Sequence, residues 1–508
     1  MNVPKPSSFL TAFITVFILL GMPFSRSFAE PASENNELLQ QIDEYVRKEI
    51  SEANIPGLSV GIIQGDETLL LRSYGTAGPD DQPMTPQTPM LLGSTSKAFT
   101  AMAVMQLVEQ GLIDLDSPIG RYLPEFETSD PELTSRIKVR HLLNQTSGLT
   151  EADGRKDLAE QEDIPLRERN LRYGKVTLAA APGEQFEYSN INYSLLGWLV
   201  ETVTGDSLNH YFQRHIFTPL NMNNSFTSYE SAKEHGLAAG HRVWFGRPVP
   251  TSTNYLSHDV ATGYVISSAE DMTKYLKAHI KAGAEAAPIL SKSGFAQLFQ
   301  PGGRESNAVG YGMGWYINLG SGSKWHHGDL EHFHSAMIIL NKDGASWGIV
   351  LLANANSYFS LAPMLYQMSN NITEMIKGEP VEPVGESMKS SQNVMNVVLL
   401  ILVLAALVQF WVDYRIRNKP KASGKSLFKL AGFPLLLKGF VIWFILQLLP
   451  ELAGAPLSVI MLYQPDLGYI LMIIAGITLL AALLHLWGCY KIRSRARKNT
   501  LDAKPHNL

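Results

Sequence analysis

Three long apolar segments near the C-terminus constrain this chain more than any other feature. They cover residues 396–412, 431–449 and 468–487. A helix needs about 20 apolar residues to cross a bilayer, and each segment is about that long. We therefore expect three transmembrane helices within residues 396–487 and an integral membrane protein.

The charges between these segments predict their orientation. The connection at 450–467 carries no Lys or Arg, whereas two other stretches are basic: Arg415, Arg417, Lys419, Lys421, Lys425 and Lys429 after the first segment, and Lys491, Arg493, Arg495, Arg497 and Lys498 after the third. Basic connections stay in the cytoplasm. We therefore expect the residues before the first span to lie outside the cytoplasm and the C-terminus to lie inside it. Lys438, inside the second segment, is expected to snorkel toward the interface.

Residues 1–29 resemble a signal peptide. The segment begins with Lys5, continues with an apolar run and ends with the small residues Ser27 and Ala29, which suits cleavage after Ala29. An uncleaved anchor is the alternative, although the apolar run is short for a span. This places the following domain (30–378) outside a bacterial cytoplasmic membrane, joined by a linker (379–395) to the spans and a basic cytoplasmic tail (488–508).

Composition excludes some classes of protein. The chain has 508 residues and a formal net charge of -5, without the basic surplus of a nucleic-acid-binding protein. Its one cysteine, Cys489, excludes an intramolecular disulfide framework, so the exported domain must be held together by its hydrophobic core.

The periodicity of the soluble region predicts an α+β fold. Alternating apolar runs at 57–64 and 68–75 form a predicted hairpin, and strand-like runs return at 336–344 and 347–355 ahead of a helix at 361–377. Helical and loop-rich sequence fills the middle. We expect one antiparallel sheet built from both ends of the domain, flanked by helices, together with an all-helical region.

Four histidines within 325–335 raise the question of a metal site: His326, His327, His332 and His334. Zinc sites need a further ligand at a defined spacing, often within a signature such as H-E-x-x-H, which this stretch lacks. We therefore interpret the stretch as one wall of an active site and predict neither metal nor cofactor.

Two further motifs carry candidate chemistry. Ser94 and Lys97 stand three apart at the head of an apolar helix, where the amine can deprotonate the hydroxyl; a helix cap and a surface lysine are the alternative. Tyr188-Ser189-Asn190 precedes a second strong helix, where the tyrosine can pass a proton and the asparagine can hold an amide carbonyl. Tyr188 can equally be an ordinary buried tyrosine.

In this order, S-x-x-K, Y-x-N and H-x-G resemble the serine β-lactamase and penicillin-binding-protein superfamily, above all class C β-lactamases and D-alanyl-D-alanine carboxypeptidases. "HLLNQTSGL", "PGEQFEYSN", "YGMGW" and "LANAN" strengthen the resemblance, which spans about residues 55–356.

The resemblance implies a role for each motif residue. Ser94 would be the acylated nucleophile, Lys97 and Tyr188 would share the proton transfers, and Asn190 would orient the scissile amide. His326 would replace the family's strand cation or donor, and Gly328 would let the substrate approach. The N–H groups of Ser94 and Asp329 would form the oxyanion hole.

Two positions depart from the family pattern. His332-Phe333 stands where many relatives have glycine before the aromatic residue, so His332 is expected to narrow or polarise the acyl pocket. Gln145 replaces a common histidine and is expected to affect packing only.

The implied function is a membrane-anchored serine hydrolase that cleaves an amide after a D-amino acid. It resembles prodrug-maturation peptidases, which also carry three membrane spans, and cell-wall D-Ala carboxypeptidases or endopeptidases. Esterase or β-lactamase activity is the alternative, followed by a non-catalytic β-lactam or peptide sensor.

Overall fold

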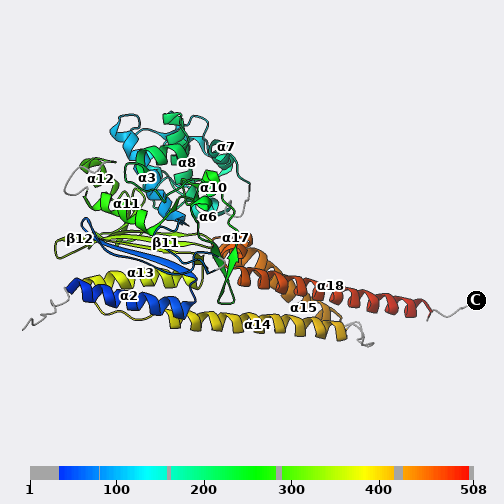
Figure 1. Ribbon diagram of the computed structural model, residues 1–508. Helices are drawn as coiled ribbons and strands as arrows, with labels where there is room; N and C mark the ends of the chain where they lie inside the picture. The colour runs from blue at the N-terminus through cyan, green and yellow to red at the C-terminus, as the bar shows by residue number, and fades with distance from the viewer. Residues whose placement is uncertain (1–33, 79–80, 157–161, 282–288, 417–426, 503–508) are drawn as a thin grey trace, which may run out of the picture.

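A computed structural model describes residues 34–78, 81–156, 162–281, 289–416 and 427–502. The expected signal peptide (1–29) lies outside the described residues. Within them the chain forms an α+β domain and a set of long C-terminal helices (Figure 1).

An eight-stranded sheet organises the domain, with the strand order β2-β1-β12-β11-β10-β9-β8-β7. Its strands are β1 Gly57–Gln64, β2 Glu67–Gly75, β7 Gly303–Arg304, β8 Val309–Gly312, β9 Trp315–Asn318, β10 Lys324–Asp329, β11 His334–Lys342 and β12 Ala345–Ala353. All neighbouring pairs are antiparallel. The pairing of β1 with β12 confirms the prediction that both ends of the domain build one sheet.

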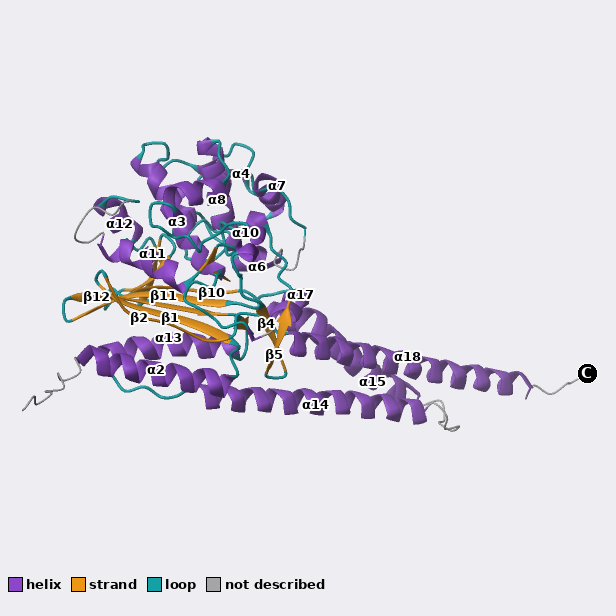
Figure 2. Ribbon diagram, viewed as in Figure 1, coloured by secondary structure: helices purple, strands orange, loops and turns teal. Residues whose placement is uncertain are grey.

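Helices cover both faces of this sheet (Figure 2). On one face lie α2 (Glu34–Ala53) and α13 (Leu361–Lys377), whose apolar side chains share a core with β1, β11 and β12. On the other face lie α11 (Ala269–Lys281) and the helical region. Because both faces are covered, β11 and β12 are almost continuously buried, which explains why their sequences lack polar alternation.

The helical region contains α3 (Ser96–Glu109) and α8 (Asn190–Thr204), which pack on each other. Its shorter helices are α4 Pro131–Thr134, α5 Val139–Leu143, α6 Glu151–Lys156, α7 Leu166–Leu171, α9 Leu208–Phe212, α10 Tyr229–Glu234 and α12 Lys292–Leu298. Two small sheets complete the domain: β13 (Ala355–Asn356) with the hairpin of β4 (Gly240–Trp244) and β5 (Arg247–Thr251), and β3 (Met90–Leu91) with β6 (Ile266–Ser267).

Three of the C-terminal helices are long and apolar enough to cross a membrane: residues 385–415, 432–452 and 465–491. They belong to α14 (Gly385–Ile416), α15 (Leu427–Trp443) with α16 (Leu449–Leu452), and α18 (Pro465–Asp502). The short helix α17 (Leu457–Tyr463) lies between the second and third spans. Most of the expected linker is therefore helical, because α14 begins at Gly385.

A buried carboxylate explains why α14 begins there. Glu49 of α2 accepts hydrogen bonds from the backbone N–H groups of Val384 and Gly385, at 3.0 and 2.6 Å. The first turn of a helix has N–H groups without an internal partner, and here an acidic side chain satisfies two of them. The first of the three apolar helices is thus attached directly to the domain.

Lys438 does not snorkel as expected. Its ammonium lies 2.8 Å from the Asp413 carboxylate of α14, and both side chains are almost fully buried. Asp413 also contacts His485 of α18, at 3.1 Å. The three spans therefore share one buried polar cluster, which the sequence did not reveal because its members come from separate segments.

We predict that Lys438→Met lowers the melting temperature of the detergent-solubilised protein. It leaves the Asp413 carboxylate without its cation, and breaking a buried ion pair costs about 3–5 kcal/mol in soluble proteins. The double variant Asp413→Asn/Lys438→Met should recover much of this loss, because an asparagine can still bond His485. An unchanged melting temperature in the single variant would show that the pair does not hold the spans together.

Candidate active site

Ser94 and Lys97 are brought together at the N-terminus of α3. Ser94 lies in the short turn Gly93–Thr95, and Lys97 follows in the first turn of the helix. The lysine ammonium nitrogen Nζ lies 3.0 Å from Ser94 Oγ and donates a second hydrogen bond, of 2.8 Å, to the Thr262 carbonyl. The predicted helical spacing thus places amine and hydroxyl in contact.

The surroundings of Lys97 favour the neutral amine. Burial lowers its pKa from 10.5 to about 7, although the carboxylates of Asp259 and Glu151 partly oppose the shift. Burial also raises the pKa of Tyr188, so this phenol keeps its proton at neutral pH; interaction with Ser94 opposes that shift. Lys97 Nζ lies 5.1 Å from the centre of the Tyr188 ring. The site therefore combines a proton acceptor with a protonated phenol.

Two glycines let the sheet approach the serine turn. Gly93 has φ +57°, and a Cβ on it would lie 2.7 Å from the Asp329 backbone nitrogen. A Cβ on Gly328 would lie 1.9 Å from the Leu92 carbonyl oxygen and 2.8 Å from the Ser94 nitrogen. The backbone nitrogens of Ser94 and Asp329 therefore lie on two segments in tight contact.

Gln145 holds the Tyr188-Ser189-Asn190 turn in place. Its side-chain oxygen accepts hydrogen bonds from the Ser189 backbone N–H at 3.0 Å and from the Asn192 side chain at 2.5 Å. Asn190 begins α8, and its side-chain oxygen has no hydrogen-bond partner among the described residues. Gln145 thus positions a motif, which goes beyond the packing role expected from the sequence.

His326 is buried and neutral. Burial and the charge of Lys97 lower its pKa to about 3, so the imidazole is no cation at neutral pH. Its Nδ1 donates to the His327 carbonyl at 2.6 Å, and its Nε2 lies 3.4 Å from the Tyr311 hydroxyl. Burial thus disfavours the cation expected as one role for this position. Because the proton of the neutral ring is on Nδ1, Nε2 can only accept a hydrogen bond in this arrangement.

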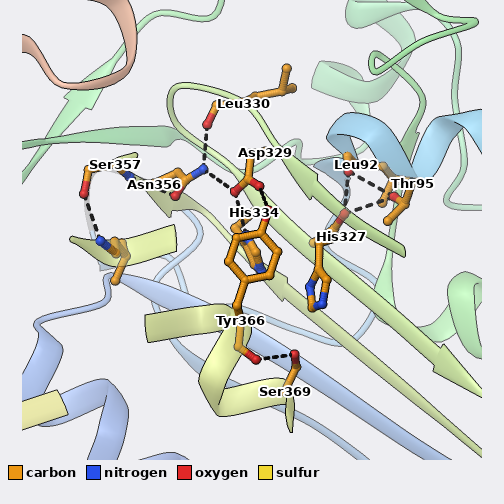
Figure 3. A network of polar contacts seen from close by, with 12 residues as sticks. Leu92, Thr95, His327, Asp329, Leu330, His334, Asn356, Ser357, Tyr366 and Ser369 are labelled. Atoms are coloured by element: carbon orange, nitrogen blue, oxygen red, sulfur yellow. Dashed lines mark hydrogen bonds and ion pairs between the residues drawn. The ribbon is translucent and has the colours of Figure 1, made fainter. Parts of the chain in front are cut away.

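A polar network holds the Asp329 carboxylate in place (Figure 3). Its carboxylate accepts hydrogen bonds from His334 Nδ1 and Asn356 Nδ2, each 2.8 Å long, and from the Tyr366 hydroxyl. Burial alone would raise the pKa of Asp329, but His334 and the hydrogen bonds keep it below its usual value. Tyr366 was missed from the sequence, because no motif joins α13 to the histidine stretch.

The His332 side chain packs beside β4. Its side chain is fully buried, bonds Thr253 Oγ1 through Nε2 at 2.8 Å and packs against Phe333 and Gly240. The residues that line the described pocket do not include it. The contacts of His332 therefore give no support to the expectation that it narrows or polarises the acyl pocket, because this side chain fills the space beside Gly240.

The motif residues surround one cavity of about 720 Å³. Ser94, Tyr188, Asn190, His326 and Asp329 line it, while Lys97 reaches it through Ser94. The cavity has room for a small peptide-sized ligand beside the serine.

We predict that a phosphonofluoridate, a probe that reacts with activated serines, labels Ser94 at a rate that rises with pH and levels off above about pH 7. Lys97 can accept the serine proton only when neutral, which is above its pKa. The measurement is the labelling rate from pH 5.5 to 9. In Lys97→Met the labelling rate should fall at least a hundredfold and should no longer rise with a midpoint near pH 7. If the midpoint persists in this variant, a group other than Lys97 causes the pH dependence.

Comparisons with known proteins agree with this geometry. Residues 40–367 match the family model described as Beta-lactamase. The chain is 28% identical over 381 residues to "Protein flp" of Staphylococcus aureus, covering 73% of this chain and 74% of that protein. It is 26% identical over 348 residues to "Unguisins hydrolase ungD'" of Aspergillus campestris, covering 63% and 62%.

Two solved structures are also similar. The octameric penicillin-binding protein homologue from Pyrococcus abyssi aligns with a TM-score of 0.57 and 26% identity, covering 68% of this chain and 79% of that one. EstCE1, described as a hydrolase with promiscuous acyltransferase activity, aligns with a TM-score of 0.59 and 20% identity, covering 68% and 99%. The fold, the matched residues and the three motifs lead to one conclusion: this chain belongs to the Beta-lactamase family, whose fold is shared by serine hydrolases and penicillin-binding proteins.

Proposed function

We propose that this protein is a membrane-anchored serine peptidase that forms an acyl-enzyme on Ser94 and cleaves an amide after a D-amino acid. The observation that carries the proposal is the 3.0 Å contact between the Lys97 amine and the Ser94 hydroxyl at the edge of a pocket. A serine hydroxyl becomes a useful nucleophile only beside a base of this kind.

In the proposed reaction, neutral Lys97 takes the Ser94 proton as Oγ bonds to the substrate carbonyl carbon. The resulting oxyanion accepts hydrogen bonds from the backbone N–H groups of Ser94 and Asp329. Its collapse breaks the C–N bond, and the leaving amine takes a proton from Lys97, directly or through the Tyr188 hydroxyl. Water then cleaves the ester by the same steps in reverse order.

The remaining motif residues would hold the substrate. Asn190 lines the pocket and would orient the scissile amide; its side-chain oxygen is buried and has no hydrogen-bond partner among the described residues. Neutral His326 would offer hydrogen bonding without charge, unlike the strand lysine of other branches of the family. The preference for a D-amino acid rests on the resemblance to D-alanyl-D-alanine carboxypeptidases.

We predict that kcat/KM for an N-acyl-D-alanyl amide exceeds that for its L isomer at least a hundredfold, because a chiral pocket holds only one isomer with its carbonyl at the oxyanion donors. Ser94→Ala is the control and should abolish both hydrolysis and covalent labelling. Equal D and L rates would contradict the peptidase proposal and favour an esterase. If Ser94→Ala still hydrolyses the amide, the reaction does not proceed through an acyl-enzyme on Ser94.

We also propose that the catalytic domain faces the outside of the cell. The support is the signal-like N-terminus together with the basic residues at 415–429 and 491–498. Alkaline phosphatase, which is active only after export, should be active when fused near Gly385 or Gly454. It should be inactive when fused near Ser423 or after Leu508. Activity at the C-terminus would contradict three spans in this orientation.

A further inference from the structure

The active-site cavity is lined not only by the hydrolase domain but also by the segment that joins the second and third spans. Ala453, Ala455, Val459, Ile460 and Tyr463 all face the cavity that contains Ser94. These residues belong to α17 and the turn before it, between α16 and α18. Figure 1 shows α17 where the domain meets the long helices.

Direct hydrogen bonds fix this segment on the domain. The Tyr463 carbonyl accepts from the Tyr358 backbone N–H at 3.3 Å, and the Gln464 side chain accepts from the Phe359 N–H at 3.3 Å. Both Tyr358 and Phe359 also line the cavity. The segment between the second and third spans is thus hydrogen-bonded to residues of the domain that line the same cavity.

A buried aspartate fixes the segment from its other end. Asp466, at the start of α18, accepts from the Gln464 side chain at 2.7 Å and from the Phe245 N–H at 3.0 Å. Phe245 lies at the tip of the β4–β5 hairpin, and its neighbour Trp244 stacks on Tyr469 of α18. The position of α17 is therefore set by contacts on both sides.

The two sides of the cavity differ in chemistry. The side formed by the helical region carries Glu151, Arg155, Glu187 and Asp259. The side formed by α17 and the turn before it carries the apolar residues Ala453, Ala455, Val459 and Ile460, with Tyr463 and Gln464 at its end. Val459 and Ile460 are buried. A substrate that fills both sides needs a polar part near the charged residues and an apolar part against α17.

We propose that α17 and the turn before it form a specificity wall that binds an alkyl group of the substrate. The preferred substrate is thus an amphiphile, processed where the domain meets the membrane. This inference rests on the proposed acyl-enzyme at Ser94 and adds the class of substrate. Only a substrate with an alkyl group can bury apolar surface against this wall, and that burial would favour its binding.

The test compares two phosphonofluoridates that differ only in an ethyl or an octyl substituent. In the parent protein, in detergent, we expect the octyl probe to label Ser94 at least tenfold faster. Ala455→Trp, which places an indole on the wall, should lower this ratio to near one. Leu452→Trp is the matched control, because Leu452 is exposed, lies just before the wall and does not line the cavity; it should keep the parent ratio.

The outcomes separate the two proposals. If neither probe labels Ser94 in the parent protein, the acyl-enzyme itself is wrong. If the ethyl probe labels Ser94 but the octyl probe is no faster, the serine hydrolase stands and the alkyl-binding wall is wrong. Should Ala455→Trp fail to fold, Val459→Ala/Ile460→Ala provides the second variant: removing apolar contacts should lower the ratio at least threefold, and an unchanged ratio overturns the proposal.

Discussion

The close approach of β10 to the turn before α3 is the constraint on which the site depends. At Gly328 there is no room for a Cβ, which would lie 1.9 Å from the Leu92 carbonyl oxygen. Ser335 of β11 bonds that same carbonyl and the Thr95 hydroxyl, so the turn is held on the sheet from two strands. Any side chain at 328 would push the strand away from the nucleophile and separate the two backbone N–H groups on which the proposed oxyanion hole rests.

This contact also explains the unusual electrostatics of the site. Because the sheet closes over the start of α3, Lys97 is fully buried and bonds a carbonyl in place of water. Loss of water favours the uncharged form of every group there, which lowers the pKa of Lys97 and His326 and raises that of Tyr188. Lys97, whose pKa is about 7, can accept a proton, and the protonated Tyr188 beside it can donate one.

The sequence predicted what local spacing and periodicity determine. The Ser94–Lys97 contact follows from helical geometry, and the hairpin and the closing strands follow from alternation. It could not predict where side chains point when their partners are distant in the chain. His332 turned toward Thr253, Gln145 proved to hold the tyrosine motif, and Lys438 paired with Asp413 of another span. Each of these contacts joins residues that are distant in the sequence, and no recognisable motif predicts the pairing.

The three apolar C-terminal helices are attached to the domain at more than one point. A domain joined to such helices by one flexible linker would have no fixed orientation relative to them. Here α2 caps the first span through Glu49, and the hairpin tip bonds Asp466 at the start of the third. Two attachments at separate points restrict rotation of the domain about either one. The segment between the second and third apolar helices then lies against the cavity that contains Ser94, so the fold itself sets how the site is oriented relative to these helices.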